Sequence, residues 1–383
     1  MTPERPTLID LFCGCGGFSL GAELAGFHSL VALDIDPTLQ SGYKKNFPNT
    51  KAIEGDVGQV QKADWRQFIG NVRPDGIIGG PPCQGFSRIG KRSKDDPRNS
   101  LIHHFYRHVE ELRPKFFVME NVEGLLDDDS RDVLITAIDR VSARYQILGP
   151  IIVNAADFGA ATNRRRVIVV GLDLTDCNSM AVEDIVPTRG TLATVADAIQ
   201  DLPAPIPDRG EKDDFGWAAY PANRSLSHYA QALRDLPPPG LGWTEAIEQL
   251  QNGLVSGQFE TRHTSAVRRR YAETKAGTCD RISKSHRLRW MGQCPTLRAG
   301  TGAEKGSFQA VRPIHPAEGR VITVREAARM QAFPDWFVFH PTKWHSFRMI
   351  GNSVSPSVSY GILHKIIQAM AKVSDCNYNR RVA

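Results

Sequence analysis

The stretch PTLIDLFCGCGGFSLGAELAGF, residues 6–27, decides the fold. It opens with a short apolar run, LIDLF, which is typical of a buried strand. A glycine cluster follows, and apolar residues then recur at helical spacing at Leu20, Leu24 and Phe27. A strand, a glycine turn and a helix in this order begin a nucleotide-binding α/β unit. The stretch therefore predicts an α/β fold with a ligand site at the turn.

The same alternation of strand and helix continues downstream. SLVALDID, a short element ending in EGDV, GIIGG, FFVMEN and RRVIVVGL predict further strands, and SLIHHFYRHVEEL predicts one of the helices between them. This rhythm indicates a largely parallel sheet with helices on both faces. Ligands of such sheets bind at the carboxyl ends of the strands. Four polar side chains follow strand ends directly: Asp34, Asp56, Cys83 and Glu120.

One of these strand ends, GGPPCQGFS at residues 79–87, places a cysteine directly after two prolines. Pro81 and Pro82 can neither continue a helix nor donate to a sheet. The glycines on either side let the backbone bend sharply or approach a ligand. A cysteine that only fills a core usually lies inside a strand or helix, so this turn is built to present the thiol of Cys83.

Composition excludes several classes of protein. The chain is 41% apolar and 23% charged, as in ordinary globular proteins, and it has no apolar run near the ~20 residues that span a bilayer. Seven cysteines without a CxxC pair argue against a disulfide framework and a zinc site. The first residues do not resemble a signal peptide. We therefore expect a cytoplasmic protein without a metal ion or a membrane segment.

The pattern changes after Gly171. From about 172 to 322 prolines and glycines cluster, and between Thr261 and Arg298 only Glu273 and Asp280 oppose a run of basic residues. Such a run is typical of a surface that faces nucleic acid, but it also fits a solvated basic face. The net charge of +5 permits a polyanionic partner without establishing one. The basic residues are Arg262, Arg268, Arg269, Arg270, Lys275, Arg281, Lys284, Arg287, Arg289 and Arg298.

Some of the polar residues at strand ends have purely structural alternatives. Asp36, followed by Pro37, reads as the N-cap of the next helix, which leaves Asp34 for a ligand. Asp56 could equally form a turn, and Glu120 could be a salt-bridge partner. The first glycine turn has Ser19 where a dinucleotide-binding motif has its third glycine, which disfavours a dinucleotide-dependent oxidoreductase.

Six motifs in order carry a resemblance to a known family: DLFCGCGGFSLG, GGPPCQGFS, MENV, NRRRVIVVG, REAARMQAFP and GNSVSP. Together they resemble the cytosine-C5 DNA methyltransferases of the bacterial modification type, which transfer a methyl group from S-adenosylmethionine to carbon 5 of cytosine. The resemblance implies a Rossmann-like catalytic domain at residues 1–171 and 346–383. It also implies a smaller, irregular target-recognition domain at residues 172–345, inserted near the C-terminus.

The resemblance implies roles for four catalytic residues. Cys83 would add to C6 of a cytosine flipped out of the duplex, and Glu120 would donate a proton or hydrogen bond to N3. Arg164 and Arg166 would hold the cytosine O2 and the nearby backbone. Flipping is needed because the reacting atoms are inaccessible inside a base stack.

The resemblance also implies the binding residues. Phe12 would stack on the adenine of S-adenosylmethionine, Asp34 would accept from the ribose hydroxyls, and Asp56 would accept from the adenine amino group. The remaining cofactor residues would be Gly14, Gly16, Gly17, Asn352, Ser353 and Val354. DNA would be contacted by Ser87, in a loop closing over the flipped base, and by Arg268, Arg269, Arg270, Arg287 and Arg289. We expect double-stranded DNA as partner, a monomeric enzyme and a cognate restriction enzyme or defence system.

One position departs from the family pattern. The family often has Pro-Gln before Asn-Arg-Arg-Arg, where this chain has Ala161 and Thr162. The glutamine helps to brace the active site, so the role of the shorter Thr162 is open. Two alternatives also remain: methylation of a structured RNA such as tRNA, and a non-catalytic DNA-binding relative. The long basic insertion favours duplex DNA, and the intact catalytic residues favour an enzyme.

Overall fold

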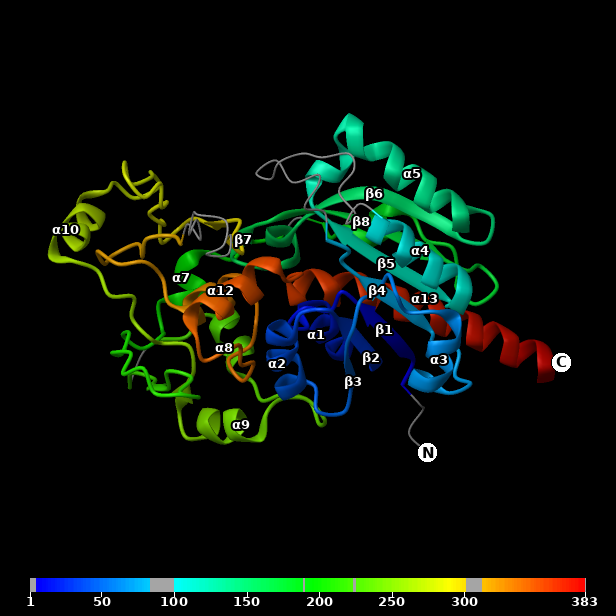
Figure 1. Ribbon diagram of the computed structural model, residues 1–383, viewed down its shortest axis with the longest axis horizontal. Helices are drawn as coiled ribbons and strands as arrows, with labels where there is room; N and C mark the ends of the chain where they lie inside the picture. The colour runs from blue at the N-terminus through cyan, green and yellow to red at the C-terminus, as the bar shows by residue number, and fades with distance from the viewer. Residues whose placement is uncertain (1–4, 83–99, 189, 223–224, 301–311, 383) are drawn as a thin grey trace.

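A seven-stranded sheet forms the centre of the computed structural model, which describes residues 5–82, 100–188, 190–222, 225–300 and 312–382 (Figure 1). The strand order is β3-β2-β1-β4-β5-β8-β6. The strands are β1 (Thr7–Leu11), β2 (His28–Asp34), β3 (Lys51–Glu54), β4 (Gly76–Gly79), β5 (Phe116–Asn121), β6 (Gln146–Asn154) and β8 (Arg165–Leu172). The first five strands pair in parallel, so their carboxyl ends share one edge.

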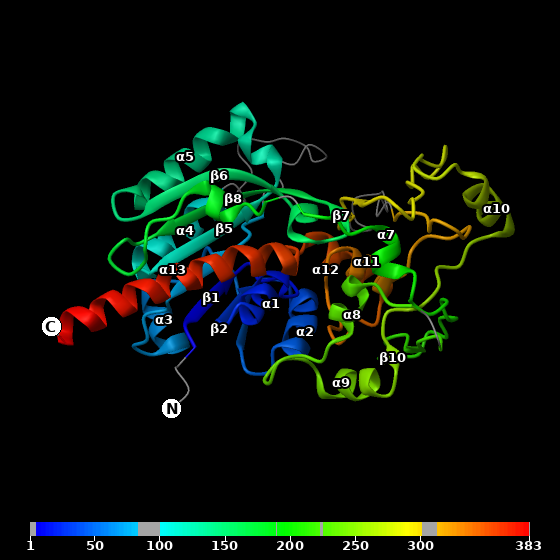
Figure 2. The ribbon, with the colours of Figure 1, turned by 180° about the vertical axis from the view of Figure 1, so that it is seen from behind.

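Both faces of the sheet are buried, as the continuous apolar runs predict. Leu8 points to one face, where it packs with α1 (Gly17–Leu24) and α13 (Pro356–Val382). Its neighbour Ile9 points to the other face, which is covered by α3 (Lys62–Ile69), α4 (Ser100–Leu112) and α5 (Asp128–Ser142). Figure 2 shows α13 running across the first of these faces. The prediction of an α/β sheet with helices on both faces is confirmed.

Strand β6 was missed in the sequence, and β8 runs opposite to its neighbours. β8 pairs antiparallel with both β5 and β6. The β6 segment QILGPIIVN does not read as a strand because Gly149 and Pro150 interrupt it. In the structure these two residues lie at a shift in register between Leu148 and Ile151, on a strand at the edge of the sheet. Proline is tolerated at such bulges and edges because no ladder hydrogen bond is lost.

The last helix packs back on the first half of the fold. Gly21 of α1 faces α13 so closely that a Cβ there would lie 2.4 Å from Ser359 Cβ. Ser359 Oγ also donates to the carbonyl of Phe18 at 2.6 Å. This contact places the chain just before α13, including Ser353, beside the glycine turn of residues 14–17.

The region after β8 consists of short elements, as its composition suggests. They are the helices α6 (Val182–Ile185), α7 (Val195–Ile199), α8 (His228–Arg234), α9 (Thr244–Gln251), α10 (Ser265–Glu273), α11 (Val324–Met330) and α12 (Lys343–Asn352), and the two-residue strands β9 (Ala218–Ala219), β10 (Leu254–Val255) and β11 (Cys294–Pro295). The chain before β8 also contains α2 (Pro37–Asn46), the two-residue strand β7 (Thr162–Asn163) and the 3-10 turns η2 (Glu123–Leu126) and η3 (Ala155–Phe158). One apolar cluster joins Tyr43 and Phe47 of the first region to Phe337 and Ile350. The two regions therefore share a core.

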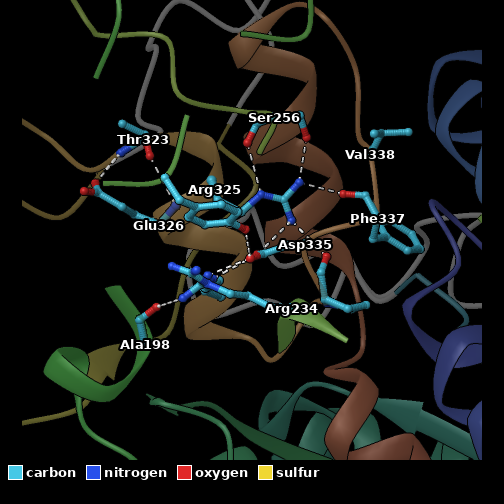
Figure 3. A network of polar contacts seen from close by, with 12 residues as sticks. Ala198, Arg234, Ser256, Thr323, Arg325, Glu326, Asp335, Phe337 and Val338 are labelled. Atoms are coloured by element: carbon cyan, nitrogen blue, oxygen red, sulfur yellow. Dashed lines mark hydrogen bonds and ion pairs between the residues drawn. The ribbon is translucent and has the colours of Figure 1, made fainter. Parts of the chain in front are cut away.

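A buried ionic network holds this second region together (Figure 3). Arg329 of α11 contacts Asp335 at 2.6 Å and Asp201 at 2.7 Å. Arg325, one turn earlier, donates to Ser256 Oγ at 2.7 Å and to the carbonyl of Phe337 at 2.8 Å. The network fixes α11 against the segment after α7 and against the loop at residue 335.

Among the residues that the structure describes, none of the helices combines the length and apolar character that a membrane span requires.

Candidate active site

The first glycine turn leaves β1 through a strained residue. Phe12 has a φ of 62°, which is unusual for a bulky side chain. The Cys13 N–H donates to the carbonyl of Leu33 at 3.1 Å, which ties the turn to β2. Such backbone outliers occur where surrounding structure fixes them, often at functional sites. Phe12 is half-buried at the sheet edge where the cofactor is expected.

The three glycines of the turn do different things. Gly14, with a φ of 55°, has no described atom within 4 Å of where a Cβ would lie, so it borders open space. A Cβ at Gly16 would lie 2.3 Å from the ring of Phe47, and one at Gly17 would lie 2.0 Å from Ser353 Oγ. Space for a ligand therefore adjoins Gly14, whereas Gly16 and Gly17 permit close packing within the protein.

Asp34, at the end of β2, braces the same turn. Its Oδ2 accepts from the Gly14 N–H at 2.8 Å and its Oδ1 accepts from the Asp36 N–H at 2.9 Å. Burial raises the pKa of Asp34, and these two donors oppose the shift. Asp36 caps α2 through the N–H groups of Thr38 and Leu39, as predicted.

Two further residues at this edge refine the sequence reading. Asp56 Oδ1 accepts from the Gly58 N–H at 2.8 Å, so it does form a turn, while none of the described residues hydrogen-bonds to its Oδ2. Ile35, directly after Asp34, is 66% exposed although it is a large apolar residue. Ile35 could not be recognised as a candidate from its sequence context, because exposure cannot be read from a strand pattern.

Two of the four catalytic residues expected from the resemblance, Glu120 and Arg166, meet beside Gly80 and Pro81. Glu120 Oε1 contacts Arg166 Nε at 2.8 Å, and both side chains are largely buried. Glu120 Oε2 would lie 3.1 Å from a Cβ at Gly80, so the carboxylate borders the start of the turn. Asn121 Nδ2 donates to the carbonyl of Pro81 at 3.1 Å and holds the turn against β5. The predicted Cys83 and Ser87 lie outside the described residues.

Arg164 differs from Arg166 in its partners, which are backbone carbonyls and not a carboxylate. Its guanidinium is buried and donates to the carbonyls of Leu297, Gly351 and Ser353 at 3.1, 3.0 and 2.8 Å. Burial lowers its pKa well below the usual value. Arg164 thus hydrogen-bonds to the main chain of two segments that are far apart in the sequence, one at Leu297 and one at residues 351–353.

Thr162 also has a definite place. Its side chain is fully buried, and its Oγ1 donates to the carbonyl of Cys294 at 2.9 Å. The two residues pair in the parallel bridge between β7 and β11. The threonine that departs from the family pattern therefore braces the chain that enters from the second region.

The three C-terminal candidates for cofactor binding, Asn352, Ser353 and Val354, lie near the first glycine turn. Asn352 ends α12 and is exposed, whereas Ser353 and Val354 are buried. Gln331 Nε2 donates to the carbonyl of Ile350 at 2.5 Å. The Arg348 guanidinium pairs with Asp36, which fastens α12 to α2.

The arginines expected to contact DNA differ in whether their side chains already have partners within the protein. Arg268 contacts Glu260 at 3.3 Å, and Arg270 contacts the buried Asp280 at 2.8 Å. Arg287 donates to the carbonyls of Tyr271 and Thr274, which fixes the end of α10. Arg269 and Arg289 are exposed, and their charged groups have no carboxylate partner among the described residues. Arg289 Nε donates to the carbonyl of Ala276 at 3.4 Å, whereas Arg269 has no side-chain partner among the described residues, so Arg269 is the more available of the two to a phosphate.

Comparison with known proteins gives the family. Residues 7–368 match the C-5 cytosine-specific DNA methylase family. The chain is 40% identical over 376 residues to the Type II methyltransferase M.XorII of Xanthomonas oryzae pv. oryzae, covering 96% of this chain and 86% of the relative. It is 32% identical to the Type II methyltransferase M.DdeI of Desulfomicrobium norvegicum, covering 94% and 88% of the two chains.

Solved structures agree. A crystal structure of a putative DNA modification methyltransferase encoded within a prophage (E. coli) superposes with a TM-score of 0.86 at 42% identity, covering 96% of this chain and 99% of that one. The S. pombe Dnmt2 methyltransferase, at 16% identity and a TM-score of 0.62 with 96% and 100% coverage, shares the fold. The chain belongs to the family of C-5 cytosine-specific DNA methylases and is a DNA (cytosine-5-)-methyltransferase.

Proposed function

We propose that the protein methylates carbon 5 of a flipped-out cytosine in a specific duplex sequence, through a covalent bond between Cys83 and C6 of the base. The observation that carries the proposal is the Glu120–Arg166 ion pair of 2.8 Å, held beside the prolyl turn that leads to Cys83. A group for N3 and a cation thus lie beside Gly80, three residues before Cys83 in the sequence.

Three residues of the chain would supply the nucleophile, the group for N3 and the cation. The Cys83 thiolate adds to C6, which forms a sulfur–carbon bond and moves electron density to C5. Glu120 Oε2, on the side away from Arg166, would share a proton with N3, while Arg166 orients Glu120 and stabilises negative charge on the ring. S-adenosylmethionine, when bound, supplies the electrophilic methyl group. A base then removes the C5 proton, the C5–C6 double bond re-forms and the thiolate leaves.

The residues at the glycine turn fit S-adenosylmethionine. Gly14 borders open space, and each carboxylate oxygen of Asp34 accepts one backbone hydrogen bond, which leaves further acceptor capacity for ribose hydroxyls. Ile35 and Phe12 offer apolar surface beside Asp34 for an adenine ring. Asp56 Oδ2 and the exposed Asn352 would complete the site.

The two proposed domains would have separate functions. Residues 1–171 and 346–383 would form the catalytic domain, and residues 172–345 would read the DNA. The exposed Arg269 and Arg289 support phosphate contacts. We propose a monomer that works beside a restriction enzyme of the same specificity, since relatives at 40% and 32% identity are Type II methyltransferases.

Two linked experiments test the proposal. Bisulfite sequencing of DNA from cells that express the protein should reveal one methylated sequence. An oligonucleotide with that sequence and 5-fluorocytosine at the target should then trap the protein in a denaturant-stable adduct, because fluorine cannot leave as a cation. The mass of the adduct should include the transferred methyl group.

The cysteine variants separate the mechanism from the activity. Cys83→Ser should abolish both methylation and trapping, whereas Cys279→Ser, an exposed cysteine of the second region, should retain them. Trapping that persists in Cys83→Ser would overturn the covalent role of Cys83. Methyl transfer to tRNA but not to duplex DNA would overturn the DNA substrate.

A further inference from the structure

The buried guanidinium of Arg164 contacts both the loop assigned to the cofactor and the region assigned to DNA. We propose that Arg164 is a positioning residue through which cofactor binding and DNA recognition are energetically coupled. The inference rests on the proposed function, because it assigns the cofactor to the loop at residues 351–353 and DNA to the second region.

The guanidinium connects one segment from each side. On the cofactor side it donates through one nitrogen to the carbonyls of Gly351 and Ser353, at 3.0 and 2.8 Å. On the DNA side its other terminal nitrogen donates to the carbonyl of Leu297 at 3.1 Å. Arg166, two residues further along β8, holds Glu120. Arg164 thus lies between the cofactor loop, the recognition region and the catalytic carboxylate.

The position of the segment around Leu297 depends on the chain just before Arg164. Four hydrogen bonds attach it to the chain before Arg164. Cys294 N–H donates to Ala161 O and Thr162 Oγ1 donates to Cys294 O, both at 2.9 Å. Asn163 Nδ2 donates to Gln293 Oε1 at 3.3 Å, and Thr296 Oγ1 donates to Asn163 O at 2.8 Å. It also touches the cofactor loop, since a Cβ at Gly351 would lie 2.4 Å from Ala299 N.

The same segment is placed to respond to DNA. It follows the basic residues Arg287 and Arg289 directly in the chain. Arg298, the residue after Leu297, is exposed while Leu297 is buried against Arg164. A phosphate that engages Arg298 would therefore order the main chain whose carbonyl Arg164 binds.

Burial makes the guanidinium sensitive to each of its partners. Among the described residues no carboxylate pairs with Arg164, its hydrogen-bond acceptors are the three backbone carbonyls, and its Nε has no partner. In a low-dielectric site, losing one acceptor of a charged donor is costly. Ordering the Leu297 segment therefore favours the arrangement that also holds Gly351 and Ser353. A second ligand then meets a site that the first has already ordered, which gives positive cooperativity.

Calorimetry with S-adenosylhomocysteine tests the coupling without turnover. The full chain is titrated alone and with saturating duplex that carries the sequence found by bisulfite sequencing. The wild-type protein should bind S-adenosylhomocysteine at least about 5-fold more tightly with DNA, within the usual range of coupling between sites. In Arg164→Gln the two affinities should become equal, whatever the affinity of the free protein is.

Matched variants protect the test against misfolding. Arg165→Gln changes the next residue, whose exposed side chain pairs with Glu123 at 3.0 Å, and should keep the wild-type coupling. Thr162→Val removes the hydrogen bond from Oγ1 to the carbonyl of Cys294 and should reduce the coupling, while Thr162→Ser should keep it. If Arg164→Gln does not fold, the Thr162 pair decides. An enzyme that methylates DNA but shows no coupling, or shows it unchanged in these variants, would overturn the inference and leave the proposed function intact.

Discussion

At the scale of single residues, carboxylates in the first glycine unit combine structural and binding tasks. Asp34 holds the N–H groups of Gly14 and Asp36, so it shapes the turn that it also offers to a ligand. Asp10 is buried and accepts from Ser19 Oγ at 2.6 Å, and Tyr43 donates to the same hydroxyl at 2.8 Å. Ser19, which stands in place of a third glycine, therefore completes a buried polar chain.

Asp34→Ala should weaken S-adenosylmethionine binding in the absence of DNA. The variant loses acceptors for the ribose hydroxyls and for two backbone donors, which suggests a loss of about 1.5–3 kcal/mol. Titration calorimetry measures the change. Glu54→Ala, the exposed register partner of Asp34 on β3, is the control and should bind normally. Equal affinities of the Asp34 variant and the wild type would remove Asp34 from the site.

Asp10→Asn should stabilise the protein in a pH-dependent way. Burial raises the pKa of Asp10 to about 7, above its value of about 4 in the unfolded chain. The folded state therefore binds the proton more tightly, and the stability that this contributes is lost as the pH rises through 7. The advantage of the asparagine variant should grow from pH 5 to pH 8.5, reaching roughly 2–4 kcal/mol.

Urea unfolding at the two pH values measures this difference. Asp139→Asn, an exposed acid of α5, is the control. A gain that is the same at pH 5 and pH 8.5 would contradict the assignment of the raised pKa to Asp10.

At the scale of elements, α10 shows that a basic run is not uniform. Its neighbouring arginines have separate tasks, since Arg270 pairs with the buried Asp280 while Arg269 is exposed. Arg287, from the following turn, closes the C-terminal end of the helix. Only part of the run can therefore serve a phosphate backbone.

Replacing Arg268, Arg269 and Arg270 together by glutamine should flatten the dependence of DNA affinity on salt. Each lost phosphate contact should lower the slope of log K against log salt by about 0.9. Fluorescence anisotropy between low and moderate salt gives the slope. Arg269→Gln alone should cause most of the change, and Arg66→Gln, on the remote helix α3, should cause none. An unaltered slope in the triple variant would make α10 a solvated face.

At the scale of the whole molecule, the second region depends on ion pairs as well as on apolar packing. Arg329 is fully buried between Asp335 and Asp201. Burial tends to raise the pKa of Asp335, but Arg329 overcomes this and holds the pKa below its usual value. The pair thus adds stability above the unfolded pKa, which is lost as the pH falls through the lower folded value.

Arg329→Met should destabilise the protein by about 3–5 kcal/mol at neutral pH, because two buried carboxylates, Asp201 and Asp335, each lose one of their arginine partners. Urea unfolding measures the loss. Arg262→Met removes an exposed arginine with one hydrogen bond to the carbonyl of Asp208 and should change stability by about 0.5 kcal/mol or less. If the two variants are equally stable, the network contributes nothing that packing cannot replace.

Local chemistry explains what could be predicted without a structure. The glycine turn, the strands around it and the Asp36 cap were predictable because turns, caps and buried strands leave signals within a few residues. The helix α4 was predicted with its observed bounds for the same reason. The ordered motifs likewise carried the family, since each depends on residue types that the chemistry requires in one order.

Patterns within a few residues thus predicted the α/β class, the strands of its first half and the polar residues that follow them. Tertiary structure alone decided that Glu120 meets Arg166, that Thr162 reaches Cys294 and that Arg164 grips Gly351. These partners lie 46, 132 and 187 positions apart, so no local pattern specifies them. Strand β6 escaped prediction because an interrupted edge strand gains its identity only from pairing with β8. Long-range contacts form when the whole chain buries its apolar surface, and only the folded chain shows which polar groups that burial brings together.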